Sequence, residues 1–343
     1  MPPLLEVKDL KVSFFTPVGE VKAVDGISYS LDNGEVMGIV GESGSGKSVE
    51  AFALMGILDD PGKISGGSVL FDGQSILDLS RKELEQIRGS RISMIFQNPM
   101  DSLNPVYTVG NQMIGVLRKH KSGISSQDAK EKALEMLRLV GITNPEQRLR
   151  QYPFELSGGM CQRVMIAMSL ICEPRLLIAD EPTTALDVTI QAQILELMKS
   201  IKERTDMAII FITHNLAVIA EICDKVSVMY GGHIVEQGSV DDIFYNPSHP
   251  YTKGLLRSMP RLDETQADRL IPIEGTPINM LDPNPGCPFA PRCDSCMRIC
   301  VNEMPPSSGI NAAYNATYNA THNATHCAAH TASCWLLKKD GYK

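Results

Sequence analysis

No apolar run in the sequence reaches the roughly 18 residues that a membrane-spanning helix needs. The opening stretch, MPPLLEVKDL, has neither the basic nor the apolar segment of a secretory signal peptide. Positive charge is also in deficit, because 32 lysines and arginines stand against 40 aspartates and glutamates and leave a net charge of −8. That balance disfavours a broad nucleic-acid surface, which has to be positive to bind phosphates. We therefore expect a cytosolic protein with no nucleic-acid partner.

The composition also lacks the marks of a disordered or fibrous chain, since 43% of the residues are hydrophobic and 21% are charged. A length of 343 residues suggests about two domains of unequal size. Apolar patterns predict strands at 4–15, 36–40, 92–96, 176–180, 208–213 and 225–230. Helical patterns, notably at 127–140 and 188–204, lie between strands, and this alternation predicts an α/β fold with a largely parallel sheet.

Two segments interrupt this alternation. Residues from about 98 to 173 are mostly helical in pattern, and we interpret them as a helical subdomain. After Met259 the chain becomes proline-rich and irregular, which indicates a boundary near residue 258. We predict one domain at 1–258 and a small, irregular, cysteine-rich domain at 259–343. Within the second, the repeat YNATYNATHNAT at 314–325 is too polar to pack and is expected to form an exposed loop.

A glycine-rich loop follows the predicted strand at 36–40 and precedes a helical pattern, which is the context of a phosphate-binding loop. The pattern G-x-x-x-x-G-K-S is fulfilled by Gly41, Glu42, Ser43, Gly44, Ser45, Gly46, Lys47 and Ser48. In such loops the backbone N–H groups bind phosphate oxygens. Lys47 is then expected to bind the β- and γ-phosphates, and Ser48 to ligate Mg²⁺.

Two adjacent acids, Asp180 and Glu181, end the predicted strand at 176–180. Asp180 fits the acid on the Mg²⁺ side of a phosphate-loop enzyme, and Glu181 is placed to polarise the attacking water as a general base. Taken alone, these two acids could simply form an acidic turn after a strand. The phosphate loop at 41–48 favours the catalytic interpretation instead.

A second glycine-rich turn precedes an apolar helical pattern: Leu156, Ser157, Gly158, Gly159 and Met160. Alone it could be an ordinary helix cap. It resembles the signature loop of the ATP-binding cassette (ABC) family, although Met160 replaces the usual Gln and Cys161 replaces the Arg of the peptide-transporter branch. The resemblance covers residues 4 to about 258. It implies a phosphate-loop NTPase fold with a RecA-like parallel core sheet, an antiparallel β subdomain and a helical subdomain, which binds ATP with Mg²⁺.

The resemblance extends, in the expected order, to further positions that would each be unremarkable alone. It implies that Gln97 contacts Mg²⁺ and the attacking water. It implies that His214 contacts the γ-phosphate and supports the water held by Glu181. Asp187, in the sequence Ala-Leu-Asp, corresponds to the loop that crosses the dimer interface.

The same resemblance implies that Phe14 stacks on adenine, with Phe15 as the alternative if the strand register differs. In the family, two ATPase domains pair head to tail. Ser157, Gly158 and Gly159 of one subunit would then contact the γ-phosphate that the other subunit holds.

Two elements are similar to those of the dipeptide/oligopeptide importer ATPases, a branch that includes nickel importers: IFQNPMDSLNP at 95–105 and HPYT at 249–252. This implies an ATPase at the cytoplasmic face of the cell membrane. Its partners would be two permease subunits and either a second homologous ATPase or another copy of itself, with a peptide-binding protein outside the cell contacted only indirectly. The alternatives are nickel import, a non-transport ABC ATPase acting on nucleic acid, and a small-molecule kinase, which would not need a signature loop.

The sequence contains nine cysteines, six of them between Cys287 and Cys334. A reducing compartment favours a metal site over disulfides. The spacing C-x₅-C-x₆-C of Cys287, Cys293 and Cys300 differs from the C-x₂-C pairs of most zinc ribbons. The family resemblance implies a [4Fe–4S] cluster, and structural zinc competes with it because four thiolates serve either metal. The implied ligands are Cys287, Cys293, Cys300 and Cys334, with Cys327 as the alternative fourth ligand and Cys296 as a spare.

Overall fold

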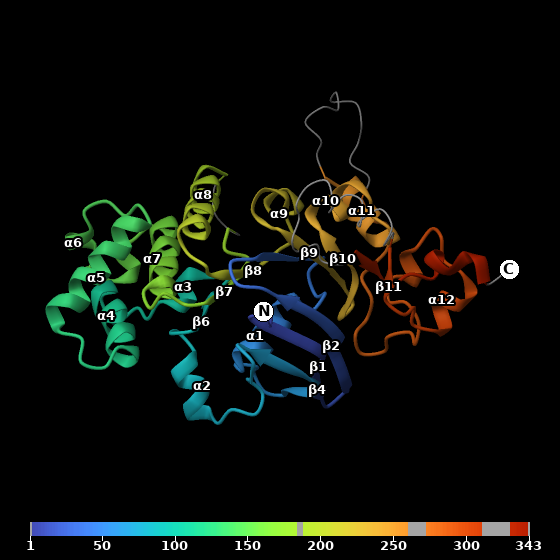
Figure 1. Ribbon diagram of the computed structural model, residues 1–343, viewed down its shortest axis with the longest axis horizontal. Coiled ribbons are helices and arrows are strands. Elements are labelled where there is room, and N and C mark those ends of the chain that lie inside the picture. Colours follow the sequence, from blue (N-terminus) through green and yellow to red (C-terminus); the bar gives the residue numbers. More distant parts are fainter. Residues whose placement is uncertain (1, 184–187, 260–271, 311–329, 342–343) are drawn as a thin grey trace. The chain divides into compact units, whose positions relative to one another are not determined.

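The computed structural model describes residues 2–183, 188–259, 272–310 and 330–341 (Figure 1). The chain divides into two compact units. Unit 1 is formed by the described residues of 1–4, 31–35 and 71–212, and unit 2 by those of 5–30, 36–70 and 213–343. Asp187, Cys327 and the repeat at 314–325 lie outside the described residues.

Unit 2 contains a sheet in which three long strands have the order β2-β1-β4, namely β1 (Leu5–Thr16), β2 (Gly19–Leu31) and β4 (Gly62–Phe71). Only two residues separate β1 from β2, so the two strands form an antiparallel hairpin. Asp9 has a left-handed φ of 46°. Leu5, Val7, Leu10 and Val12 are all buried because the alternation shifts by one residue at this point.

A second sheet of unit 2 has the order β11-β12-β10-β9-β3. Its strands are β3 (Val36–Val40), β9 (Lys225–Tyr230), β10 (His233–Ser239), β11 (Ser308–Gly309) and β12 (Thr331–Ala332). β3 and β9 are parallel, and every residue of both is buried, as expected for strands covered on both faces. β10 is antiparallel to β9 and β12 is antiparallel to β10, so the cysteine-rich C-terminal region extends this sheet.

The helices of unit 2 are short. They are α1 (Lys47–Met55), α9 (Leu216–Ile222), α10 (Val240–Tyr245), α11 (Pro250–Arg257) and α12 (Arg298–Asn302), with the 3₁₀ helices η2 (Ala290–Arg292) and η3 (Trp335–Gly341).

Unit 1 is built on a parallel sheet with the order β8-β7-β6. These strands are β6 (Ile92–Ile95), β7 (Leu176–Asp180) and β8 (Ala208–Thr213), and a short strand β5 spans Gln74–Ser75. The α/β class with a parallel sheet, predicted from the sequence, is confirmed. The long helix predicted at 188–204 is observed as α8 (Val188–Arg204).

The remaining helices of unit 1 lie mostly between β6 and β7 in the chain, where the sequence predicts a helical subdomain. They are α2 (Arg81–Ile87), α3 (Pro99–Ser102), α4 (Val109–His120), α5 (Ser126–Leu139), α6 (Pro145–Arg148), η1 (Pro153–Glu155) and α7 (Gly158–Leu170). The side chains of Thr108 and Ser125 cap α4 and α5, respectively, so both helices begin at hydrogen-bonding residues.

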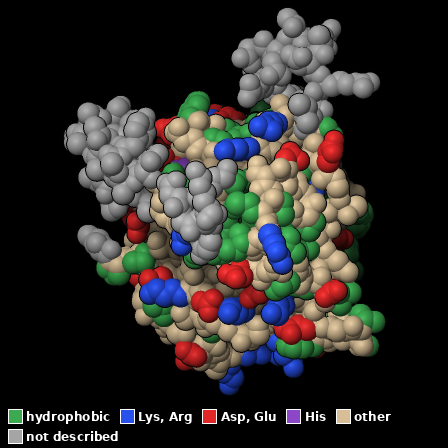
Figure 2. All heavy atoms as spheres, turned by 90° about the vertical axis from the view of Figure 1, so that its right-hand side faces the viewer, with side chains coloured by type: hydrophobic (Ala, Val, Ile, Leu, Met, Phe, Trp, Pro, Cys, Tyr) green, Lys and Arg blue, Asp and Glu red, His purple; other side chains and the backbone are tan. Residues whose placement is uncertain are grey.

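Among the described residues, no helix is both long and apolar enough to cross a bilayer. The face of the molecule on the side of α12 is shown in Figure 2. Basic and acidic side chains are interspersed across it, with hydrophobic side chains between them.

A buried acid joins the C-terminal region to the second sheet of unit 2. Glu236 of β10 is only 1% exposed. Its carboxylate accepts hydrogen bonds from the backbone N–H groups of Ser248 (2.7 Å) and His249 (2.9 Å), and Nε2 of His330 lies 2.9 Å from Oε1. Burial raises the pKa of Glu236, but these hydrogen bonds outweigh it and leave the pKa below its ordinary value.

Replacing this acid tests the contribution of the junction to stability. Glu236→Ala leaves the N–H groups of Ser248 and His249, together with the buried His330, without their acceptor, so we expect the free energy of unfolding to fall by about 3 kcal/mol. Urea titration at neutral pH measures the change. Glu303→Ala, which removes an exposed acid, is the control and should change stability by less than about 0.5 kcal/mol. Equal losses of stability in the two variants would contradict the conclusion that Glu236 stabilises this junction.

Candidate functional site

The shape of the phosphate loop in unit 2 depends on close backbone contacts. Gly46 caps α1 with a left-handed φ of 102°. A Cβ atom on Gly41 would lie 2.1 Å from the carbonyl oxygen of Met229, and one on Gly46 would lie 2.3 Å from that of Ala23. Any side chain at either position would displace backbone, so both glycines are required where they stand.

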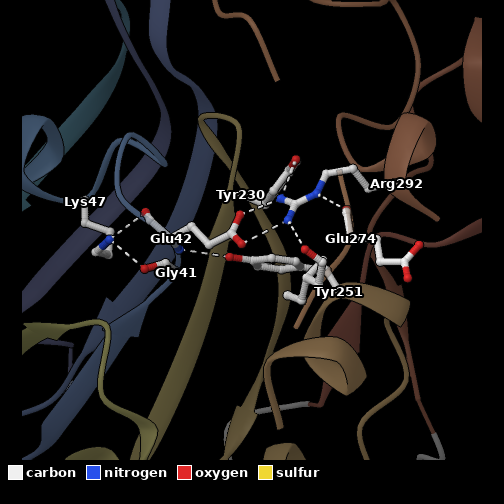
Figure 3. Close-up of polar contacts among 8 residues, drawn as sticks. Gly41, Glu42, Lys47, Tyr230, Tyr251, Glu274 and Arg292 are labelled. Carbon is white, nitrogen blue, oxygen red and sulfur yellow. Dashed lines mark hydrogen bonds and ion pairs between the residues drawn. The ribbon is translucent and has the colours of Figure 1, made fainter. Parts of the chain in front are cut away.

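Lys47 is only 6% exposed, and its ammonium group points back into the loop (Figure 3). The Nζ atom donates to the carbonyl oxygens of Gly41 (2.8 Å) and Glu42 (2.9 Å) and lies 3.4 Å from Oγ of Ser45. The positive charge is therefore held within the loop that the sequence predicts to bind phosphate. Ser48 follows at the first turn of α1.

In unit 1 the two acids predicted to act in catalysis lie at the end of β7. Asp180 is 2% exposed, whereas Glu181 is partly exposed and has a left-handed φ of 46°, which is unusual for a residue with a side chain. Oε2 of Glu181 accepts a hydrogen bond of 3.0 Å from Nε2 of Gln97, which follows β6. The structure thus brings together Gln97 and Glu181, because the carboxyl ends of two parallel strands lie side by side.

The predicted signature turn lies at the start of α7, also in unit 1. Ser157 is the N-cap residue, and its Oγ accepts a hydrogen bond from the N–H of Met160 at 3.3 Å. Ser157 and Gly158 are exposed. Cys161 is fully buried, and its Sγ lies 3.4 Å from the carbonyl oxygen of Pro153. The helix N-terminus is therefore exposed despite the two departures from the family pattern, Met160 and Cys161.

His214 and the two candidate aromatic residues lie in unit 2. His214 is exposed directly after β8. The ring of Phe14 is partly buried against Gly62, where a Cβ atom would approach it to 2.8 Å. Phe15 is 50% exposed. A ring that stacks on a ligand needs a free face, so exposure favours the alternative, Phe15.

Four cysteines of unit 2 line one small cavity together with His249, Phe289 and Trp335: Cys287, Cys293, Cys300 and Cys334. They are the four implied by the family resemblance, and Cys296 is exposed. Burial, reinforced by the neighbouring thiols, raises the pKa of Cys287 to about 12 and that of Cys293 to about 11. In the described part of the chain, no group of three or more His, Cys, Asp or Glu side chains is arranged so that it could hold a single metal ion.

Two features beside the phosphate loop were not predicted from the sequence. Arg292 and Tyr251, from the C-terminal part of unit 2, contact Glu42 (Figure 3). Glu50 of α1 is 1% exposed and accepts a hydrogen bond from the hydroxyl of Tyr29. Burial raises the pKa of Glu50 to about 7, although the hydrogen bond opposes this change. Nothing in the sequence near Glu50 distinguishes it from a solvent-exposed glutamate in the first turn of a helix.

Comparison with known proteins adds to this description. Residues 24–184 match the family described as ABC transporter, and residues 235–300 match the family described as oligopeptide/dipeptide transporter, C-terminal region. The oligopeptide transport ATP-binding protein OppD of Bacillus subtilis (strain 168) is 55% identical over 304 residues, which cover 88% of this chain and 85% of that protein. The dipeptide transport ATP-binding protein DppD of the same organism is 54% identical over 306 residues, which cover 89% of this chain and 91% of that protein.

Among solved structures, the chain is similar to the ATP-binding cassette MJ0796 in a dimeric, post-hydrolysis state bound to ADP and phosphate. The TM-score is 0.63 at 26% identity, and the match covers 69% of this chain and 98% of that one.

The buried carboxyl of Glu50 predicts a pH dependence of stability. Because its pKa rises from about 4.5 in the unfolded chain to about 7 in the folded one, its contribution is complete below about pH 4.5 and is lost as the pH rises through 7. The shift corresponds to about 3 kcal/mol of unfolding free energy. Glu50→Gln should remove this part of the pH dependence.

Urea titrations at about pH 5 and about pH 8 measure the loss in each protein. The exposed Glu20 of β2 supplies the control variant, Glu20→Gln, which should keep the wild-type pH dependence. If Glu50→Gln loses as much stability as the wild type between the two pH values, the pH dependence does not come from the Glu50 carboxyl.

Proposed function

The chain belongs to the ABC transporter family, and from that membership we propose that it hydrolyses ATP to drive the import of dipeptides or oligopeptides across the cell membrane. The observation that carries this proposal is the extent of the likeness. Identity of 55% over 88% of the chain includes both the phosphate loop and the C-terminal region. The relatives' names favour peptides over nickel as the transported substrate.

We assign ATP binding to the phosphate loop. The backbone N–H groups from Gly41 to Ser48 bind the phosphate oxygens, and Lys47 neutralises the β- and γ-phosphates. The oxygen donors of Ser48, Gln97 and Asp180 are hydroxyl, amide and carboxylate, which is the donor set that Mg²⁺ prefers. When bound, Mg²⁺ supplies charge neutralisation between the phosphates.

Glu181 is the proposed general base for hydrolysis. Its carboxylate accepts a proton from the water whose oxygen attacks the γ-phosphorus, while the bond to the leaving ADP oxygen breaks. The hydrogen bond from Gln97 fixes the direction of this carboxylate. His214 contacts the γ-phosphate, and an aromatic ring of β1, Phe14 or Phe15, stacks on adenine.

The exposed signature turn is proposed to act on a second subunit. Ser157, Gly158 and Gly159 present a helix N-terminus, which favours a bound anion. One nucleotide does not need two phosphate-binding loops from the same chain, so this turn completes the nucleotide site of a partner subunit. Asp187 would lie in the loop that crosses the interface between them. That partner is a second homologous ATPase or another copy of this chain.

The segment 98–113 is the proposed docking site of the two permease subunits. Three large apolar side chains are exposed within it: Met100 (45%), Val106 (72%) and Tyr107 (53%). Exposed apolar groups of this kind are typical of a surface that another protein covers. The segment starts directly after Gln97, so docking can influence a residue that touches Glu181. The protein would accordingly act at the cytoplasmic face of the membrane.

We propose that Cys287, Cys293, Cys300 and Cys334 hold a [4Fe–4S] cluster. Thiolates are ligands of such clusters and of zinc alike. The four cysteines that line one cavity supply the four thiolates that a [4Fe–4S] cluster needs, and the family resemblance favours the cluster over zinc. When bound, the group would cross-link the irregular C-terminal segment.

The role of Glu181 is tested by Glu181→Gln, which keeps the shape of the side chain and removes its basicity. Hydrolysis should fall at least about 100-fold, because the attacking water loses its general base. ATP binding should persist, and the variant should accumulate as an ATP-bound dimer in size-exclusion chromatography. Glu196→Gln, at an exposed position of α8, is the control. A variant that hydrolyses ATP normally, or stays monomeric with ATP, would refute this role.

The cysteine site is tested by metal and sulfide analysis of protein purified without air. We expect about four irons and four sulfides per chain. Cys293→Ser should lose most of the iron, whereas Cys296→Ser should retain it, because Cys296 does not line the cavity. Zinc without iron or sulfide would exclude the cluster in favour of the competing metal.

A further inference from the structure

The second residue of the phosphate loop, Glu42, is bound by a residue 250 positions later in the chain. Nη1 of Arg292 donates to Oε2 of Glu42 at 2.6 Å, and Nη2 donates to Oε1 at 3.1 Å. The hydroxyl of Tyr251 accepts a hydrogen bond from the N–H of Glu42 at 2.9 Å. Figure 3 shows these contacts beside the ammonium of Lys47. A bidentate ion pair of this geometry fixes the orientation of the carboxylate and also neutralises its charge.

Arg292 is itself held in place. Its side chain is only 4% exposed. Nε donates to the carbonyl oxygen of Glu274 at 2.9 Å, Nη2 to that of Ile273 at 3.0 Å, and Nη1 to the hydroxyl of Tyr230 at 3.3 Å. The guanidinium also lies over the rings of Tyr230 and Phe289. The arginine therefore has one defined position, and that position is set by the C-terminal region.

Every polar group of Glu42 has a partner. Its N–H is bound by Tyr251, its carboxylate by Arg292, and its carbonyl oxygen by Lys47 at 2.9 Å. The orientation of Glu42 thus determines one of the acceptors that hold the lysine ammonium. The carboxylate also places a negative charge in a loop that has to bind phosphates, and Arg292 neutralises that charge.

We propose that Arg292 is a positioning residue for ATP: it neutralises and orients Glu42, so that the cysteine-rich C-terminal region is part of the nucleotide site. This inference rests on the proposed ATP site and adds a residue from outside the family's phosphate-loop motif. The alternative is that the ion pair only fastens the C-terminal region to the rest of unit 2. The two alternatives predict opposite effects when the carboxylate alone is removed.

The test measures the dissociation constant of Mg·ATP by calorimetry, together with KM and kcat, in three variants of the full chain. Arg292→Gln leaves the Glu42 carboxylate unpaired beside the phosphates, so affinity should fall about tenfold, with a rise in KM and little change in kcat. Glu42→Gln leaves Arg292 as an added cation, so affinity should rise about threefold. The double variant should return close to the wild-type affinity.

Two further measurements separate repulsion from loss of structure. The deficit of Arg292→Gln should shrink in high salt, because salt screens a repulsive charge but does not repair a misplaced loop. Arg292→Lys keeps the charge and should bind ATP within about threefold of the wild type, which gives a readout if Arg292→Gln fails to fold. Arg298→Gln, at an exposed arginine of α12, is the control and should not change affinity.

The inference is overturned if Glu42→Gln weakens ATP binding, or if the double variant binds no better than Arg292→Gln. It is also overturned if Arg292→Gln binds ATP as well as Arg298→Gln. In each case the wild type still binds ATP and the proposed function stands. A wild-type protein that binds no ATP would instead refute the proposed function itself.

Discussion

A buried cation lies at the centre of the phosphate loop. The ammonium of Lys47 is held by two backbone carbonyl oxygens, those of Gly41 and Glu42. Removing a charge from water costs several kcal/mol unless oriented groups replace the water, so these carbonyls have to point inward. That orientation requires a backbone that passes within contact of β2 and β9, which only glycine allows at positions 41 and 46. The loop is therefore shaped by the strands on which it lies as much as by its own sequence.

The C-terminal region adds to that support. The segment with Arg292 lies between Cys287 and Cys300, and the N–H of Cys287 donates to the carbonyl oxygen of Cys300 at 2.7 Å. It contains only one short 3₁₀ helix and the five-residue α12, so regular secondary structure contributes little to its rigidity. Cross-linking through a metal group can replace a hydrophobic core in so small a region. The proposed cluster would then have a mechanical task, which is to hold the arginine that binds Glu42.

Much of the fold follows from local patterns in the sequence. Continuous apolar runs predict the buried parallel strands, and helical periodicity predicts α8 to the residue. The meeting of Gln97 and Glu181 also follows, since both stand at the carboxyl ends of parallel strands. The choice between the two phenylalanines does not follow, because the family resemblance favours Phe14 whereas Phe15 has the more exposed ring.

Long-range pairing of charges is the part that sequence patterns miss. Arg292 and Glu42 each fit an ordinary surface position, and nothing within a few residues of either predicts their partner 250 positions away. The acids of the chain show the same limit. Glu50 and Glu236 are both 1% exposed, yet burial raises the pKa of the first while hydrogen bonds lower that of the second. The two pKa shifts differ because hydrogen-bond donors surround Glu236 more fully than Glu50, and only the fold places those donors.

On the proposed function, a single chain would be an incomplete enzyme. The phosphate loop satisfies its own lysine through loop carbonyls, and Glu42 is neutralised from within unit 2. The signature turn differs, because Ser157 and Gly158 are exposed and the N-terminus of α7 carries partial positive charge outward. A dipole that faces water contributes little, whereas one that faces a γ-phosphate in a closed interface is unscreened and strong. The energy of dimer closure would therefore come largely from the nucleotide, and loss of the γ-phosphate would remove the anion that this turn is proposed to bind.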